Sequence, residues 1–219
     1  MTSLSSRKIH LIASVIILVV IAICYGHTLH YPFVNWDDYK LVRDHPYNKS
    51  LDWENLKNLL NPFVTGSVKI VRDFSHAVDF SIWGNNTTGF HLGNLAFYAI
   101  SSLLVFSLLR QLLRNDLAAM FGALLFVTHP LHVESITWLS ARKEALGATF
   151  FLLALLIYIR KARPGSPKRG VYWSVCFLCY LLAIFSKETA VVLPAIIVIY
   201  EAAFGDRTNK DFGIVRRSL

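Results

Sequence analysis

The stretch Ile9–Tyr25, IHLIASVIILVVIAICY, decides the fold class of this chain. It is almost entirely apolar, and the basic pair Arg7-Lys8 precedes it. A helix needs roughly 17–25 apolar residues to cross about 30 Å of hydrocarbon, so this stretch is long enough to span a membrane. A charged start followed by an apolar core also fits a cleaved signal peptide. We favour an uncleaved helix, because the core is long for a signal and no small-x-small cleavage motif follows it.

The remainder of the chain is also apolar, with 54% hydrophobic residues and a mean hydropathy of +0.46 over 219 residues. This composition is unusual for a soluble domain of this size. Cys176 and Cys179 form a C-x-x-C motif inside an apolar segment, where packing is a better explanation than metal or redox chemistry. We therefore predict an all-α integral membrane protein with about six transmembrane helices. The predicted spans are Ile9–Tyr25, Gly93–Leu109, Leu117–Val127, Ala145–Ile159, Val171–Phe185 and Ala190–Phe204.

Basic residues orient these spans, because Lys and Arg concentrate in the short cytoplasmic loops of membrane proteins. Of the 22 Lys and Arg residues, 13 fall in segments that the six spans place on one side. We assign this side to the cytoplasm and interpret the net charge of +8 as a consequence of topology. The expected partner of this charge is anionic membrane lipid, and we expect no nucleic acid. The residues are Arg7, Lys8, Arg110, Arg114, Arg160, Lys161, Arg163, Lys168, Arg169, Arg207, Lys210, Arg216 and Arg217.

The predicted organisation is a first transmembrane helix (1–26), an extracytoplasmic loop (27–90), five further spans (91–204) and a basic cytoplasmic tail (205–219). The loop contains seven of the 14 acidic residues. Its apolar periodicity predicts two amphipathic helices, Asp52–Leu60 and Asp73–Trp83. In the second helix the apolar face is Phe74, Ala77, Val78, Ser81 and Ile82. These helices either lie flat in the membrane interface or pack as a small loop domain.

Polar groups from four separate segments gather on the predicted outer side. Ionisable groups near the membrane are costly, so such a cluster is a candidate site. Carboxylates can bind a hard cation or accept a proton from a hydroxyl, and Arg and Lys can bind phosphate. The combination suits transfer of a group from a lipid-phosphate donor. The candidate catalytic residues are Asp37, Asp38 and Glu134, and the candidate residues for lipid phosphate or sugar are Arg72, His91, His132, Arg142, Lys143, Lys187 and Glu188.

Several of these residues have structural alternatives. Asp38 could cap a helix, Glu134 could pair with Arg142, and Lys187 could pair with its neighbour Glu188. Asp38 and Glu134 are also the candidate ligands for a divalent metal, Mg²⁺ or Mn²⁺. His129 and His132 resemble half of a metal site that Glu134 could extend, although packing or substrate hydrogen bonding explains them better.

Four segments together resemble one known family: FVNWDD (33–38), RDFSHAVDFSIWGNNTTGFHLGN (72–94), THPLHVESITWLSARKEALGATFFLLALLIY (128–158) and LLAIFSKETAVVLPAIIVIYE (181–201). In this order they are similar to the transmembrane and tetratricopeptide-repeat O-mannosyltransferases and their prokaryotic relatives, which are GT-C glycosyltransferases. The resemblance runs from about residue 25 to residue 202. Its most specific part is HP-x-HVE followed by SxR, and then SKE before a span that contains proline.

This resemblance implies a transferase that takes a sugar, for example mannose, from a polyprenyl-phosphate donor to a hydroxyl of an acceptor protein or glycan, such as protein Ser/Thr, on the extracytoplasmic side. Asp37-Asp38 then matches the first-loop acidic pair, Glu134 a second acidic position, and Arg72, Arg142 and Lys187 the basic residues that face the lipid phosphate. Family members often have Arg-Pro at Arg72-Asp73, and they have further spans and a repeat array. We therefore expect this chain to be the N-terminal membrane part and inactive alone. The alternative is a non-enzymatic membrane protein, such as a transporter piece or an assembly subunit.

Overall fold

The computed structural model describes residues 6–161 and 168–215, and every regular element in these ranges is a helix. The predicted all-α fold of a membrane protein is therefore confirmed. The predicted basic residues Arg163, Arg216 and Arg217 lie outside the described residues, as do the side chains of Arg7, Arg207 and Lys210. The long helices are α1 (Ser6–Tyr25), α5 (Thr87–Leu113), α6 (Asp116–Thr128), α8 (Arg142–Lys161), α9 (Arg169–Ser186) and α10 (Leu193–Val215).

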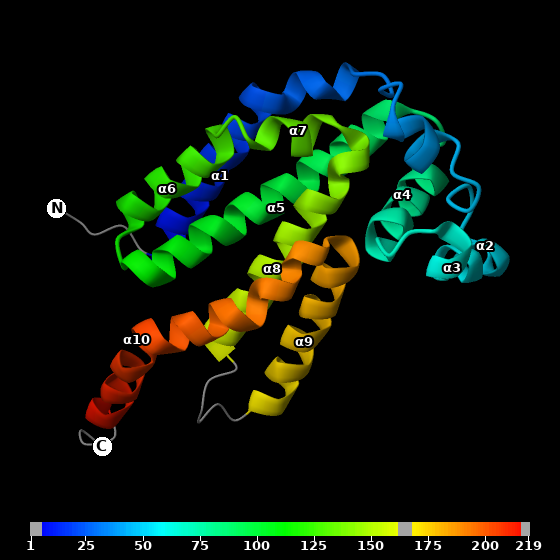
Figure 1. Ribbon diagram of the computed structural model, residues 1–219. Coiled ribbons are helices and arrows are strands. Elements are labelled where there is room, and N and C mark those ends of the chain that lie inside the picture. Colours follow the sequence, from blue (N-terminus) through cyan, green and yellow to red (C-terminus); the bar gives the residue numbers. More distant parts are fainter. Residues whose placement is uncertain (1–5, 162–167, 216–219) are drawn as a thin grey trace.

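Short helices fill the connections at one end of the long ones (Figure 1). The first connection contains the 3₁₀ helix η1 (Gly26–His30), the single π-helical turn η2 (Tyr39–Arg43), α2 (Trp53–Leu59), α3 (Pro62–Thr65) and α4 (Ile70–Trp83). The second contains α7 (His132–Thr137) and η3 (Leu139–Ala141), and the third contains η4 (Glu188–Val192).

Helices α1, α5 and α6 lie side by side and share one apolar core (Figure 1). Ala119 and Ala123 of α6 are fully buried in it, because small side chains let helices approach closely. The hydroxyls of Tyr25 and Tyr98 both donate to the carbonyl of Val127, at 3.1 and 3.0 Å. These bonds satisfy a carbonyl in the last turn of α6 that has no partner within the helix.

Helices α8, α9 and α10 form a second core. Cys176 and Cys179 are buried there, and the Cys176 thiol donates to the carbonyl of Ala154 at 3.4 Å. The packing role predicted for these thiols is confirmed. Helix α8 also packs on α5, where the hydroxyls of Ser101 and Thr149 are 2.8 Å apart. This contact joins the two cores.

Three helical stretches in the described part of the chain are long and apolar enough to cross a membrane: Lys8–His30, Thr87–Leu113 and Arg169–Ser186. Helix α6 has 13 residues and is therefore about 20 Å long, which is less than the hydrocarbon thickness. Helix α8 has charged residues at both ends, Arg142–Glu144 and Arg160–Lys161. Helix α10 continues to Val215, past Phe204 where the predicted span ends. The count of six spans remains a prediction.

Both predicted amphipathic helices exist, and in the second the polar side packs inward. Asp52 caps α2 by accepting from the amide of Asn55 at 2.9 Å, and Gly84 (φ 58°) ends α4. In α4 the apolar residues Phe74 and Ile82 are 43% and 65% exposed, whereas the polar residues of the other face are buried. The inner face is stabilised by ion pairs of Arg72 with Asp73 and of Asp79 with Arg142. The buried residues are Arg72, Asp73, His76 and Ala77.

Candidate functional site

Arg142 is the centre of a buried polar network at the N-terminal end of α8. Its guanidinium forms an ion pair with Asp79 of α4, with Nη1 and Oδ2 2.5 Å apart. Its Nε donates to Oδ1 of Asn94 at 2.6 Å, and Nη2 donates to the carbonyl of Phe90 at 2.6 Å. The side chain has no exposed surface. Arg142 therefore ties α4 and α5 to α8, and its charge is balanced inside the protein.

A glycine makes room for this ion pair. A Cβ atom at Gly93 would lie 2.8 Å from Oδ2 of Asp79 and 2.9 Å from Nη2 of Arg142. Burial raises the pKa of Asp79, and the charge of Arg142 opposes this rise. The sequence alone had offered Glu134 as the structural partner of Arg142, but the structure gives that place to Asp79.

Arg72 and Asp73 form a second buried ion pair on α4. The Nε and Nη2 atoms of Arg72 lie 2.7 and 2.5 Å from Oδ1 of Asp73, and both side chains are at most 3% exposed. His76 lies one turn further along α4 and is fully buried. Burial, together with the charges of Arg142 and Arg72, lowers the pKa of His76 well below its ordinary value. Arg72 is thus neutralised by its own neighbour in sequence.

The acidic pair of the first connection separates into a buried and an accessible member. Asp38 is fully buried. Its Oδ1 accepts from the amide and hydroxyl of Ser140, at 2.9 and 2.6 Å, and its Oδ2 accepts from the amide of Val34 at 3.0 Å. It precedes η2, but its side chain does not cap that helix. Asp37 is half-buried, and among the described residues its carboxylate has no hydrogen-bond or ion-pair partner.

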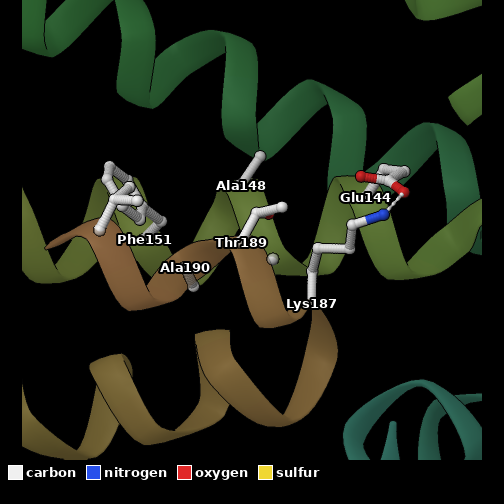
Figure 2. Close-up of a pocket in the computed structure, with 8 residues that line it drawn as sticks. Glu144, Ala148, Phe151, Lys187, Thr189 and Ala190 are labelled. Atoms are coloured by element: carbon white, nitrogen blue, oxygen red, sulfur yellow. Dashed lines mark hydrogen bonds and ion pairs between the residues drawn. The ribbon is translucent and has the colours of Figure 1, made fainter.

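A pocket of ≈ 320 Å³ between α8 and η4, here called the lysine pocket, is lined by Lys187 and Glu144 together with mostly small and apolar residues (Figure 2). Lys187 pairs with Glu144 of α8, with Nζ and Oε1 2.5 Å apart. Lys69, at the start of α4, pairs with Glu188 at 3.2 Å. The alternative in which Lys187 pairs with Glu188 is therefore wrong, since each residue pairs with a different helix. Gly147 lines the pocket where a Cβ atom would lie 2.9 Å from the Cβ of Lys187.

Lys143 lies next to Arg142 in sequence but differs from it in its surroundings. It is partly exposed, and no carboxylate of the described residues lies within ion-pair distance of its ammonium group. Partial burial, followed by the positive charges of Lys187, Lys69 and Arg72, lowers its pKa. Lys69, Arg72 and Lys187 thus lie near Lys143, and of these four cations Lys143 alone lacks an acidic partner among the described residues. Such a cluster can bind an anion such as phosphate.

The remaining predicted residues are more widely placed. Glu134 is exposed in the first turn of α7. His132 packs on Phe126, with ring centroids 4.3 Å apart. His91 is buried near the start of α5, with its ring at an edge-on angle to Tyr31. His132 therefore packs against an aromatic ring, as the packing alternative predicted.

The sequence predicts a divalent metal at Asp38 and Glu134. Within residues 6–161 and 168–215, no three His, Cys, Asp or Glu side chains lie close enough together to hold an ion. Asp38 already accepts three hydrogen bonds from the protein. Both oxygens of Asp38 are thus engaged by donors of the protein, and the Mg²⁺ or Mn²⁺ centre stays a prediction.

Sequence reasoning missed several residues of this region. Lys69 and Asn94 were not predicted, although both belong to the ion pairs and hydrogen bonds at this end. Lys69 lies three residues before Arg72, one turn away at the N-terminus of α4. The three-residue spacing from Arg72, which places both side chains on one side of a helix, was the sequence signal for Lys69. The signal for Asn94 was its place within an apolar helix, because a buried side-chain amide requires a hydrogen-bond partner.

Comparison with known proteins relates the chain to membrane mannosyltransferases. Protein O-mannosyl-transferase TMTC3 of Mus musculus and that of Homo sapiens are each 27% identical over 215 residues, covering 92% of this chain and 22% of the relative. Protein O-mannosyl-transferase TMTC2 of Homo sapiens is 28% identical over 129 residues, covering 58% of this chain and 15% of the relative. The chain thus spans about a fifth of the length of the TMTC3 proteins. No solved structure matches it.

The family model for dolichyl-phosphate-mannose-protein mannosyltransferases matches residues 70–215. This match begins at α4 and includes the buried network, the lysine pocket and helices α5 to α10. It covers more than half of the chain, and the apolar helices agree with a membrane location. The chain is a membrane protein that belongs to the dolichyl-phosphate-mannose-protein mannosyltransferase family.

Proposed function

We propose that this chain forms the donor-phosphate side of a membrane mannosyltransferase that takes mannose from a polyprenyl-phosphate donor and transfers it to a protein hydroxyl. The observation that carries the proposal is the group of lysines at the N-terminal end of α8, in which Lys143 lacks an acidic partner among the described residues. The names of the relatives support mannose as the sugar and protein as the acceptor.

The lysines would bind the phosphate of the donor. Lys187 and Lys69 are held in place by Glu144 and Glu188, and Lys143 would add a charge that no carboxylate neutralises. When the sugar leaves, negative charge grows on the phosphate, and fixed cations stabilise such charge. Arg72 and Arg142 are buried in ion pairs with Asp73 and Asp79, so we assign them to holding the lysine-bearing helices in place.

Asp37 is the best candidate for the base that accepts the proton of the acceptor hydroxyl, because its carboxylate is partly exposed and unpaired among the described residues. Asp38 would position this segment through its bonds to Ser140. Glu134 remains a candidate for a second acidic role. We propose no step through a metal, since the charge on the leaving phosphate can be neutralised by lysine.

The test is binding of a polyprenyl-phosphate mannose to the purified chain in detergent. Lys143→Gln should weaken binding by about 10- to 100-fold, which is the value of one charge-assisted hydrogen bond. Lys143→Arg should retain most of the affinity, because the charge remains. The matched control is Lys57→Gln on α2, which removes an exposed charge of the first connection. Equal affinities for Lys143→Gln, Lys57→Gln and the unaltered chain would refute the phosphate role.

We further propose that this end of the molecule faces the extracytoplasmic side, since the basic segments lie at the other ends of the long helices. A cysteine at Ser50 should react with a membrane-impermeant thiol reagent in intact cells, and a cysteine at Lys168 should react only after permeabilisation. The unaltered chain, with Cys24, Cys176 and Cys179, gives the background. The reverse labelling pattern would place the lysine pocket in the cytoplasm.

A further inference from the structure

A second cationic pocket lies at the opposite end of α5 and α8 from the lysine pocket. Its volume is ≈ 340 Å³, and every lining residue is polar: Arg110, Gln111, Arg114, Asp116 and Arg160. These residues come from the C-terminal end of α5, the N-terminal end of α6 and the C-terminal end of α8. The pocket therefore exists only because three helix ends meet.

Basic residues outnumber acidic ones in the described lining of this pocket. Asp116 is the single acid among the lining residues, and it forms an ion pair with Arg110. Arg160 donates from Nη2 to the carbonyl of Ser107 at 3.2 Å, which is an uncharged acceptor. Among the described lining residues, three arginines thus face one aspartate. Arg114 and Arg160 both have exposed side chains, so an anion can reach them from outside.

The pocket is too far from the lysine site to share its ligand. Arg142 and Arg160 mark the two ends of α8, and a helical rise of 1.5 Å per residue separates them by about 27 Å. This separation is close to the thickness of the hydrocarbon core. An anion bound by Arg160 would thus belong to the opposite leaflet from the donor phosphate proposed above.

We propose that this arginine pocket is a binding site for the phosphodiester headgroup of an anionic phospholipid. Arginine presents several donors in a fixed plane that matches phosphate oxygens, and the cavity exceeds the size of a bare phosphate ion. Basic pockets between transmembrane helices are a known way to recognise anionic headgroups. The inference is independent of the transferase proposal, because it uses different residues at the other end of the molecule.

The experiment is titration of the purified 219-residue chain with phosphatidylglycerol in a neutral detergent, with bound lipid counted by native mass spectrometry. The pocket variant is Arg114→Gln/Arg160→Gln. The control is Lys168→Gln/Arg169→Gln, which removes two exposed charges near the start of α9, outside the pocket. Thermal unfolding of both variants checks that the fold is intact, as expected for exposed positions.

We expect the pocket variant to bind phosphatidylglycerol at least about tenfold more weakly, since each basic residue near a lipid phosphate contributes appreciably to binding. The control should bind like the unaltered chain, and phosphatidylcholine should bind equally weakly to all three proteins. A similar loss in both double variants would mean general attraction by surface charge and would overturn the site. Inorganic phosphate that displaces the lipid at comparable concentration would identify a soluble anion as the ligand and overturn the lipid assignment.

Discussion

Arg142 and Lys143 are consecutive basic residues, yet Arg142 is buried in an ion pair and Lys143 is partly exposed. Arg142 lies in the buried network, with Asp79, Asn94 and the Phe90 carbonyl around its guanidinium. Lys143 lies among the lysines near the pocket, where other cations surround it. Sequence reasoning had assigned both to one phosphate site. The comparison teaches that burial and pairing, rather than residue type, separate a charge that stabilises the fold from a charge available to a ligand.

The largest expected effect is the loss of the buried cation. Arg142→Met should destabilise the chain by about 3–5 kcal/mol, because Asp79 would be left buried without its partner. Thermal or denaturant unfolding in detergent measures this change. The double variant Arg142→Met/Asp79→Leu should recover part of the loss. Unfolding of Arg142→Met at the temperature of the unaltered chain would contradict a structural role.

A second variant tests the same network without removing a charge. Gly93→Ala places a methyl group against Asp79 and Arg142, and overpacking of this kind costs about 1–3 kcal/mol. Gly26→Ala is the control, since no atom lies within 4 Å of the added Cβ. Equal stability of the two glycine variants would show that the ion pair adapts easily.

Asp37 and Asp38 should also differ from each other, with Asp38 affecting stability and Asp37 affecting activity. Asp38→Asn should destabilise the chain by about 1–3 kcal/mol, because the amide nitrogen would face N–H or O–H donors of Val34 and Ser140. Asp37→Asn should leave stability nearly unchanged but reduce mannose transfer by the complete enzyme by about 10²–10⁴, the usual value of a general base. Radiolabelled mannose transferred from the polyprenyl-phosphate donor measures the rate. Wild-type transfer by both variants, singly and together, would remove the acidic pair from the mechanism.

The smallest expected effect is a pH dependence of stability that arises in the buried network. The folded-state pKa of His76 is lowered, so the unfolded chain binds a proton more readily than the folded chain. This contribution to stability is complete above the unfolded pKa of about 6.5 and is lost as the pH falls toward the folded pKa. His76→Asn should make unfolding less dependent on pH below this value, and the exposed His30→Asn should not. Identical pH profiles for all three proteins would refute the assignment.

The positions of the main helices were largely predictable, because an apolar run in a membrane protein is a local property of the sequence. The predicted spans correspond to helices α1, α5, α6, α8, α9 and α10, and the two predicted amphipathic segments correspond to α2 and α4. The inner face of α4 was not predicted: Arg72, Asp73 and His76 are buried there, whereas Phe74 and Ile82 are exposed. A residue pattern gives the period of a helix, but the partner of each face depends on segments that are distant in sequence.

The sequence by itself determined that the chain is helical and membrane-bound, and its motifs identified the mannosyltransferase family that residues 70–215 match. It also supplied the candidate acidic and basic residues of the site. Only the tertiary structure decided that Arg72, Arg142 and Asp38 are enclosed in ion pairs and hydrogen bonds, while Lys143 and Asp37 remain accessible. The physical reason is that desolvation and pairing depend on atoms brought together from α4, α5, α8 and the first connection, and sequence distance does not encode these contacts.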